Sequence, residues 1–423
     1  MRMREGAQAV DRRRHRPARG MFPWGSRDGI PNQVHHFDRT PEMTTNRLNA
    51  LHEVGQSIWL DFIDRTILQN GDLARMIRGD ALTGMTSNPT IFEKALAEGD
   101  EYDDQIKSAP PGLTAWDLFE LVETTDVRTA CDIFADTNRA ANGKDGFVSI
   151  EVSPGVSNDA DASIAEARRL WATVSRPNVM VKIPGTPEGA RAVRALIADG
   201  VNVNITLLFS IEAHRSVIEA YMAGLEDRLA AGKEISGISS VASFFVSRVD
   251  TEVDKRLDAI AAKGDAALKD RAMALKGRAA VANAKLAYKL FQDMFASERW
   301  AKLSARGGQL QRPLWASTST KNPAYRDVVY VEELIGPDTV NTMPPATAEA
   351  FKDHGTVERT VDRNLREAQR VMEQLADIGI DFNDVTKKLL VDGLASFQKS
   401  FDSLIAGLER KTKTLGRPIG AGR

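Results

Sequence analysis

The stretch Asn178-Val179-Met180-Val181-Lys182-Ile183-Pro184 sets a lysine inside a short, mostly β-branched run. Proline bounds the run on both sides, which predicts a buried strand of a parallel sheet. Alternation along this strand puts Met180 and Lys182 on one face. Burying an ammonium group is costly unless the group is paired or loses its proton. Lys182 is therefore either a strand-end lysine whose head reaches water or an amine that can attack a carbonyl and form a Schiff base.

Length and composition are those of an ordinary globular protein. The 423 residues are 42% apolar and 27% charged. The net charge of -2 argues against a general binder of nucleic acid or membrane surfaces, and no apolar run approaches the ~20 residues that span a membrane. Cys131 is the single cysteine, which fits a reducing cytoplasm. The histidines show no ligand spacing, and we expect neither a metal nor another cofactor.

The two ends of the chain differ from its middle. Residues 1–43 are rich in arginine, glycine and proline without a hydrophobic period, so we expect a disordered leader. The leader lacks the apolar core of a secretory signal, and a translation start at Met43 would leave it untranslated. We expect residues 44–410 to form one domain and residues 411–423 to form a flexible basic tail.

Short apolar runs alternate with helical patterns through residues 44–410. Besides the lysine run, strands are expected near residues 57–63, 82–89, 146–154, 201–208, 236–245, 312–318 and 338–344. The helix expected over 187–199 begins with proline and ends before glycine. The ambiguous segment 327–335 is taken as helix, and residues 359–411 are expected to be helical. Eight strands separated by helices, without a dinucleotide-binding glycine motif, predict an α/β fold: a (β/α)₈ TIM barrel with additional helices. An open doubly wound sheet is the alternative.

Polar residues lie near the C-terminal ends of most of these strands, where a TIM barrel builds its active site. Parity along each strand aims one set at a common cavity: Asp61, Asn88, Glu151, Lys182, Asn204, Thr206 and Ser243. Each residue alone has a structural explanation, such as capping a loop or pairing with an arginine. Two carboxylates and a lysine together are harder to explain in this way, because structural barrels fill their interiors with Val, Ile and Leu.

Five motifs resemble those of the transaldolases, within the class I aldolases, and the chain length is similar to that of the longer bacterial subgroup. The resemblance covers roughly residues 46–410, whereas the leader matches no family that we can name. The motifs are Thr86-Ser87-Asn88-Pro89-Thr90, Val148-Ser149-Ile150-Glu151-Val152-Ser153-Pro154, Val181-Lys182-Ile183-Pro184-Gly185-Thr186, Asn202-Val203-Asn204-Ile205-Thr206-Leu207-Leu208-Phe209-Ser210 and Trp315-Ala316-Ser317-Thr318-Ser319-Thr320-Lys321.

The resemblance implies transfer of a dihydroxyacetone unit between sugar phosphates in the non-oxidative pentose phosphate pathway. The donor would be sedoheptulose 7-phosphate or fructose 6-phosphate, and the acceptor glyceraldehyde 3-phosphate or erythrose 4-phosphate. Lys182 would form the Schiff base, and Asp61 would take the proton of the C4 hydroxyl group. Glu151 and Thr206 would hold a water molecule for proton transfers. No metal would be needed, because the iminium serves as the electron sink.

The resemblance also implies the substrate-binding residues. Asn88 and Asn204 would hold substrate hydroxyl groups and the intermediate. Ser243 and Arg248 match the family's phosphate-binding serine and arginine, and a guanidinium group grips phosphate through two hydrogen bonds. After strand seven the family often has an arginine, whereas this chain has Lys321, which leaves the third phosphate ligand open.

Two other functions stay open at this point. An enzyme of the fructose 6-phosphate aldolase type would release free dihydroxyacetone instead of transferring it, although such chains are shorter. A non-catalytic barrel scaffold would lack the lysine or one of the carboxylates. The expected partners are sugar phosphates, with neither nucleic acid nor membrane, in the cytoplasm. Monomer and homodimer are both compatible with the sequence.

Overall fold

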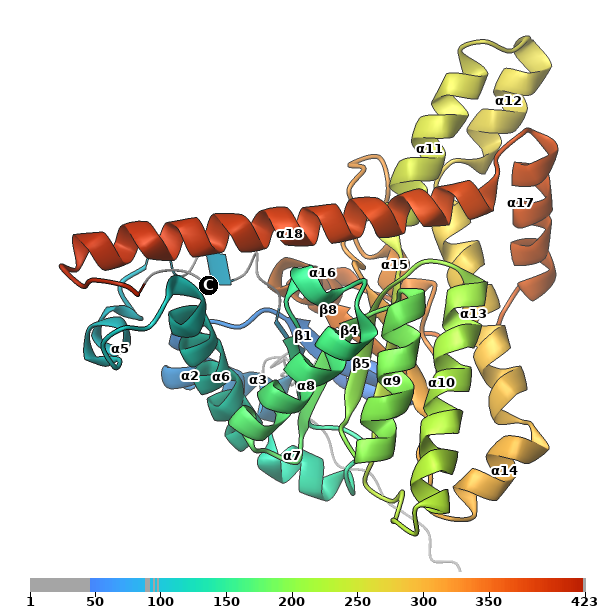
Figure 1. Ribbon diagram of the computed structural model, residues 1–423. Helices are drawn as coiled ribbons and strands as arrows, with labels where there is room; N and C mark the ends of the chain where they lie inside the picture. The colour runs from blue at the N-terminus through green and yellow to red at the C-terminus, as the bar shows by residue number, and fades with distance from the viewer. Residues whose placement is uncertain (1–45, 88–91, 94–95, 97–98, 421–423) are drawn as a thin grey trace, which may run out of the picture. The chain divides into compact units, whose positions relative to one another are not determined.

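The computed structural model describes residues 46–87, 92–93, 96 and 99–420 (Figure 1). The predicted leader, residues 1–43, and Asn88 lie outside the described residues. Within them, parallel strands pair in sequence order and close into a barrel. The strands are β1 (Gln56–Asp61), β2 (Leu82–Thr86), β3 (Phe147–Glu151), β4 (Val179–Pro184), β5 (Val203–Leu208), β6 (Ser240–Phe245), β7 (Gln311–Ala316) and β8 (Thr339–Met343). The predicted (β/α)₈ barrel is confirmed, and the open doubly wound sheet is wrong.

The helices that the structure describes surround the strands and extend beyond them. Up to β4 they are α1 (Arg47–Glu53), α2 (Arg65–Gln69), α3 (Asp72–Gly79), α5 (Asp103–Ser108), α6 (Ala115–Ile133), α7 (Ala135–Ala140), the 3₁₀ turn η1 (Pro154–Val156) and α8 (Ala160–Val174). Between β4 and β8 they are α9 (Pro187–Asp199), α10 (Ile211–Ala230), α11 (Ser247–Ala261), α12 (Ala266–Leu275), α13 (Ala279–Phe295), α14 (Glu298–Ser304) and α15 (Val329–Glu332). After β8 come α16 (Pro345–His354), α17 (Leu365–Asp377) and α18 (Phe382–Thr414).

Local sequence explains several of these boundaries. Helix α9 has the predicted range, because the Thr186 hydroxyl accepts a hydrogen bond from Gly189 N and Gly200 ends the helix with φ of 93°. The segment predicted as helix over 327–335 forms the short α15. Within the region 359–411 that we expected to be helical, the structure has two helices, α17 and α18, and Gly379 between them adopts φ of 93°.

The described part of the predicted C-terminal tail, residues 411–420, makes specific contacts with other parts of the chain. Helix α18 continues to Thr414. Beyond it, the Arg417 guanidinium donates hydrogen bonds to the backbone oxygens of Ile106 (2.6 Å) and Ala109 (2.8 Å). The amide of Gly420 donates to Leu113 O at 2.9 Å. Backbone oxygens in the last turn of α5 and just after it thus accept hydrogen bonds from this segment, contacts that the local composition does not reveal.

The barrel interior is built in layers. A small apolar cluster of inward-facing side chains fills its lower part: Trp59, Phe147, Met180, Val241, Leu314 and Val340, with Ala316 joining the cluster from the cavity above. Because side chains alternate along a strand, the residue two positions farther on faces the same interior. Asp61 therefore follows Trp59, Lys182 follows Met180, and Ser243 follows Val241 on the inner face. The parity assumed from the sequence is confirmed for these strands, and the polar layer lies at their C-terminal ends.

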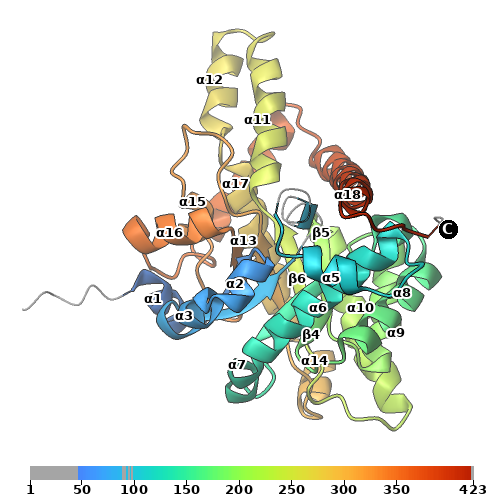
Figure 2. The ribbon, with the colours of Figure 1, turned by 90° about the vertical axis from the view of Figure 1, so that its left-hand side faces the viewer.

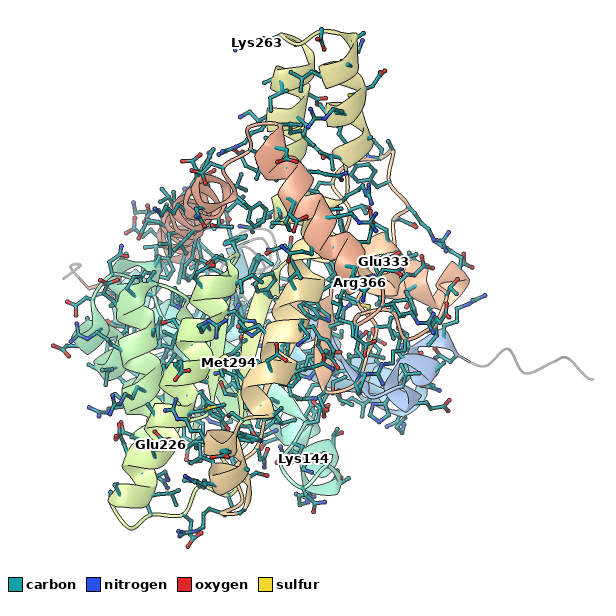
Figure 3. The ribbon with its side chains drawn as sticks, turned by 90° about the vertical axis from the view of Figure 1, so that its right-hand side faces the viewer. Lys144, Glu226, Lys263, Met294, Glu333 and Arg366 are labelled. Atoms are coloured by element: carbon teal, nitrogen blue, oxygen red, sulfur yellow. The ribbon has the colours of Figure 1, made fainter. Side chains whose placement is uncertain are left out.

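Two helical features lie beyond the ring of helices. Figure 1 shows α18 (red) lying across the end of the barrel, above the C-terminal ends of the strands. Figure 2 shows α11 and α12 side by side as a projecting hairpin. Lys263 marks the tip of this hairpin in Figure 3, whereas Lys144 lies toward the opposite end of the barrel. None of the described helices is both long and apolar enough to cross a membrane.

We predict that Gly84→Ala destabilises the barrel. A Cβ atom at Gly84 would lie 2.5 Å from the indole of Trp59 in the packed floor, and such overpacking costs about 1–3 kcal/mol. Urea unfolding would detect this cost as a lower midpoint. Gly79→Ala is the matched control, because a Cβ atom there meets nothing within 4 Å. Equal midpoints for the two variants would contradict the packing argument.

Candidate active site

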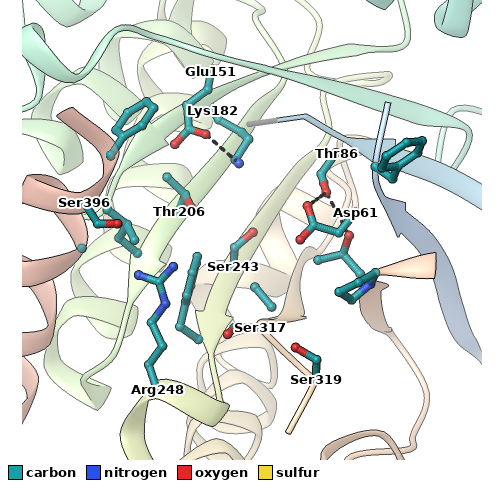
Figure 4. A pocket seen from close by; sticks show the side chains of 18 of the residues that line it. Asp61, Thr86, Glu151, Lys182, Thr206, Ser243, Arg248, Ser317, Ser319 and Ser396 are labelled. Carbon is teal, nitrogen blue, oxygen red and sulfur yellow. Dashed lines mark hydrogen bonds and ion pairs between the residues drawn. The ribbon is translucent and has the colours of Figure 1, made fainter. Parts of the chain in front are cut away.

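A cavity of about 840 Å³ opens at the C-terminal ends of the strands (Figure 4). Asn88 lies outside the described residues, and Asn204 does not line this cavity. The other residues predicted for the site all line it: Asp61, Glu151, Lys182, Thr206, Ser243, Arg248 and Lys321. The barrel therefore brings together side chains that the chain spreads over 260 positions, from Asp61 to Lys321 (321 minus 61).

Lys182 and Glu151 form a buried ion pair on the cavity wall. Glu151 ends β3 and lies opposite Lys182 of β4 in the strand register. Lys182 Nζ is 2.8 Å from Glu151 Oε2 and also donates to Ser87 O at 3.2 Å. The Lys182 side chain is 10% exposed and that of Glu151 7% exposed. The amine is therefore held in place, with a proton acceptor beside it.

Burial shifts the pKa values of two charged side chains on this side of the cavity, Glu151 and Arg248. It raises the pKa of Glu151 above the usual range of a glutamate, while the charge and the hydrogen bond of Lys182 oppose the shift. The pKa of Arg248 is lowered by burial, against the opposing charges of Asp61 and Glu151. Shifts of this kind are typical of groups that exchange protons or bind charged ligands.

Asp61 lies apart from the ion pair, on another wall of the cavity (Figure 4). Its Oδ1 accepts a hydrogen bond from Thr86 Oγ1 at 2.9 Å. Thr86 Oγ1 in turn lies 2.9 Å from Thr342 Oγ1. One carboxylate oxygen is thus held by a hydroxyl chain from β2 and β8.

Asn204 and Ser243 belong to a hydrogen-bonded chain within the barrel. Asn204 is fully buried; its Nδ2 donates to Ser149 Oγ at 3.0 Å, and its Oδ1 accepts from Ser243 Oγ at 2.6 Å. Ser243 lines the cavity whereas Asn204 does not. In this arrangement Asn204 orients Ser243, and direct contact between Asn204 and a substrate stays a prediction.

Cations and hydroxyl groups gather at the ends of β6 and β7. Arg248 lies in the first turn of α11, with its guanidinium carbon 5.1 Å from the centroid of the Phe245 ring. Lys321 is exposed and donates to Ser319 Oγ at 2.7 Å. Ser317 also lines the cavity here. Such donors suit a phosphate group.

Helix α18 supplies residues that we did not predict for the site. Gly393, Ser396 and Phe397 line the cavity from this helix. A Cβ atom at Gly393 would lie 3.1 Å from a methyl carbon of Leu207, a residue held at the unusual φ of 58°. The helical period of α18 indicates which of its side chains are buried, but not that the helix crosses the barrel.

Thr342 is a second residue that we missed. It lies on the inner face of β8 two positions after Val340, so the alternation used for the other strands would have identified it. Among the residues that the structure describes, no group of three or more His, Cys, Asp and Glu side chains is placed to hold a metal ion.

Comparison with known proteins agrees with this geometry. The family model described as transaldolase/fructose-6-phosphate aldolase matches residues 58–408. The chain is 48% identical over 378 residues to "Transaldolase 2" of a Nostoc species, covering 88% of this chain and 99% of that protein. It is 47% identical over 360 residues to the transaldolase of Mycolicibacterium smegmatis, covering 85% and 95%. The transaldolase of Mycobacterium leprae is 44% identical over 381 residues, covering 89% and 100%. The barrel, the buried lysine and these matches together place the chain in the transaldolase/fructose-6-phosphate aldolase family.

Proposed function

We propose that the protein is a transaldolase that works at this cavity through a Schiff base on Lys182. The observation that carries the proposal is the buried pair of Lys182 and Glu151, whose Nζ and Oε2 atoms are 2.8 Å apart on the cavity wall. A dihydroxyacetone unit would pass from sedoheptulose 7-phosphate or fructose 6-phosphate to glyceraldehyde 3-phosphate or erythrose 4-phosphate. This is a step of the non-oxidative pentose phosphate pathway. Near full-length identity to proteins named transaldolase supports transfer over simple release.

The first step joins the Lys182 nitrogen to the ketose carbonyl carbon. Glu151 already accepts a hydrogen bond from Nζ, so it can take a proton from the ammonium group and return it to the carbonyl oxygen. The carbon–oxygen bond then breaks, water leaves, and an iminium replaces the ketone. Thr206, buried on the cavity wall, would help to hold this water. The amine's protons go to the departing water, so the step needs no outside proton source.

Cleavage needs a base on another side of the substrate, and we assign this role to Asp61, which lies on another wall of the cavity. Asp61 would take the proton of the C4 hydroxyl group as the C3–C4 bond breaks. The electron pair of that bond moves into the iminium and leaves an enamine on Lys182 with an aldose phosphate. When the acceptor aldose enters, Asp61 returns the proton as the new bond forms. The bond from Thr86 keeps the carboxylate aimed during both steps.

Positively charged and hydroxyl side chains would bind the phosphate group of the substrate. We propose that Arg248, Ser243 and Lys321 hold the phosphate at the ends of β6 and β7, with Arg248 as the principal ligand because it is less exposed than Lys321 and can grip phosphate through two hydrogen bonds. Asn88 and Asn204 stay proposed for the substrate hydroxyl groups. We also propose the cytoplasm as the compartment, with which a buried thiol at Cys131 is consistent.

We predict that borohydride in the presence of fructose 6-phosphate attaches a three-carbon adduct to Lys182. Peptide mass mapping would locate the adduct. Lys285 is an internal control, because it is equally buried and 2.8 Å from Glu333 yet lies outside the cavity. Lys182→Ala should lose both the adduct and all measurable turnover. Near-normal turnover by Lys182→Ala would overturn the mechanism.

We predict a different defect for Asp61→Ala. The imine should still form, because Lys182 and Glu151 are unchanged, while turnover falls by about 10²–10⁴-fold, the usual contribution of a general base. Rapid-quench trapping would measure the imine, and release of the aldose phosphate would measure cleavage. Asp64→Ala is the comparison, since Asp64 lines the same cavity and caps α2. If Asp61→Ala lost imine formation as well, its proposed role in cleavage would be wrong.

A further inference from the structure

A second, much smaller cavity lies on the far side of Glu151. Its volume is about 10 Å³, about the space that one water molecule needs. Glu151 lines both this cavity and the large one. Phe397 also borders both, so these two side chains separate the small cavity from the substrate side. The buried carboxylate of Glu151 thus has a polar chamber behind it.

The small cavity gathers carboxyl groups from three elements. Glu151 reaches it from β3, Glu120 and Glu123 from α6, and Glu166 from α8. Helix α18 contributes Phe397 and Phe401, and the remaining side chains that line the cavity are those of Trp116, Phe119, Val152, Ser153 and Leu170.

Three of the four carboxyl groups have partners of their own. Glu151 is bound by Lys182 at 2.8 Å. Glu166 accepts hydrogen bonds from Ser153 N at 2.9 Å and Ser153 Oγ at 2.8 Å. Glu120 pairs with Arg169 toward the surface. Their negative charges are therefore compensated without the fourth carboxyl group.

Glu123 is the fourth, and it is 4% exposed. Among the ion pairs of the described residues, none includes Glu123, although the paired carboxylates of Glu151 and Glu120 line the same cavity. An ionised carboxylate at this position would lose its hydration without gaining a cation as partner. The carboxyl group of Glu123 therefore keeps its proton. Burial, followed by the charge of Glu151, raises the pKa of Glu123 well above the usual range. The charges of Glu120 and Glu166 also raise the pKa of Glu123, and the charge of Lys182 opposes the rise.

We propose that Glu123 is a positioning residue that, as a neutral acid, donates a hydrogen bond through one water molecule in this cavity to the back of Glu151. Lys182 donates its hydrogen bond to the Oε2 atom of Glu151. The other carboxylate oxygen would accept the hydrogen bond from this water. A donor behind a carboxylate stabilises its charged form, so Glu123 keeps Glu151 ionised and aimed at the amine. Glu123 itself touches neither substrate nor Lys182 and loses no proton in the cycle. The inference rests on the proposed function, since it gives Glu151 the task of proton transfer.

Two substitutions separate this role from simple packing. Glu123→Leu replaces the carboxylic acid with an apolar side chain that still fills space but cannot donate a hydrogen bond. Glu151 should therefore become protonated at a higher pH. The acidic limb of the rate of imine formation should then move up by about one pH unit, the effect of one hydrogen bond. Below that limb the variant would be about tenfold slower. Glu123→Gln restores an N–H donor and should return the limb to its original position.

Rapid borohydride trapping of the Lys182 imine across the acidic range would measure these profiles. Glu120→Gln is the matched control, because Glu120 borders the same cavity but is paired with Arg169; its profile should match that of the unaltered protein. An unmoved limb in Glu123→Leu would overturn the proposal. So would a limb in Glu123→Gln that moves as far as in Glu123→Leu.

An infrared measurement tests the proton directly and does not depend on turnover. The unaltered protein should show the carbonyl stretching band of a protonated, buried carboxylic acid, and Glu123→Gln should lose it. Absence of that band would overturn the inference even with the proposed function intact. If the unaltered protein formed no imine but showed the band, the proposed function would fail and the protonated state of Glu123 would stand.

Discussion

The buried ion pair between Lys182 and Glu151 is the interaction on which the rest of the site depends. Two charges inside a barrel lose their hydration, and their attraction compensates for this only with close geometry and further hydrogen bonds. Both conditions hold, with 2.8 Å between the charged atoms and a second bond from Nζ to Ser87 O. The pair requires β3 and β4 to be neighbours in one register, so the barrel and the chemistry constrain each other.

The layered interior gives this pair its surroundings. Below the polar layer, the apolar floor that includes Trp59 and Met180 closes the barrel. Trp59 also donates from Nε1 to Asp145 Oδ1 at 2.9 Å, which fixes the largest floor side chain from beneath. Above the polar layer, α18 covers part of the opening. The reacting groups thus stand on a rigid support, which favours precise placement of a substrate.

The sequence predicts the barrel and most of the site because side chains alternate between the two faces of a strand with a period of two residues. Lys182, Glu151 and Asp61 could be placed on the inner face by counting along apolar runs, and Thr342 would have followed from the same count. The contribution of α18 could not be predicted, since its helical period shows which side chains are buried but not which partner covers them. Asn204 shows a similar limit: its inward direction was foreseeable, but its engagement by Ser149 and Ser243 depends on neighbouring strands. The helix–helix break at Gly379 depended on one backbone angle.

The distribution of charge across the cavity favours one direction for a bound sugar phosphate. Arg248 and Lys321 come from the segments that follow β6 and β7, whereas Asp61 comes from β1 and the carboxylates of Asp64 and Glu101 also line that part of the cavity. A phosphate is attracted to the first group and repelled by the second. With its phosphate at Arg248, as we propose, a ketose would extend toward the wall that carries Lys182 and bring its carbonyl there. The C4 hydroxyl group lies between the carbonyl and the phosphate along the ketose chain, so in the proposed pose Asp61 would reach it from another wall of the cavity.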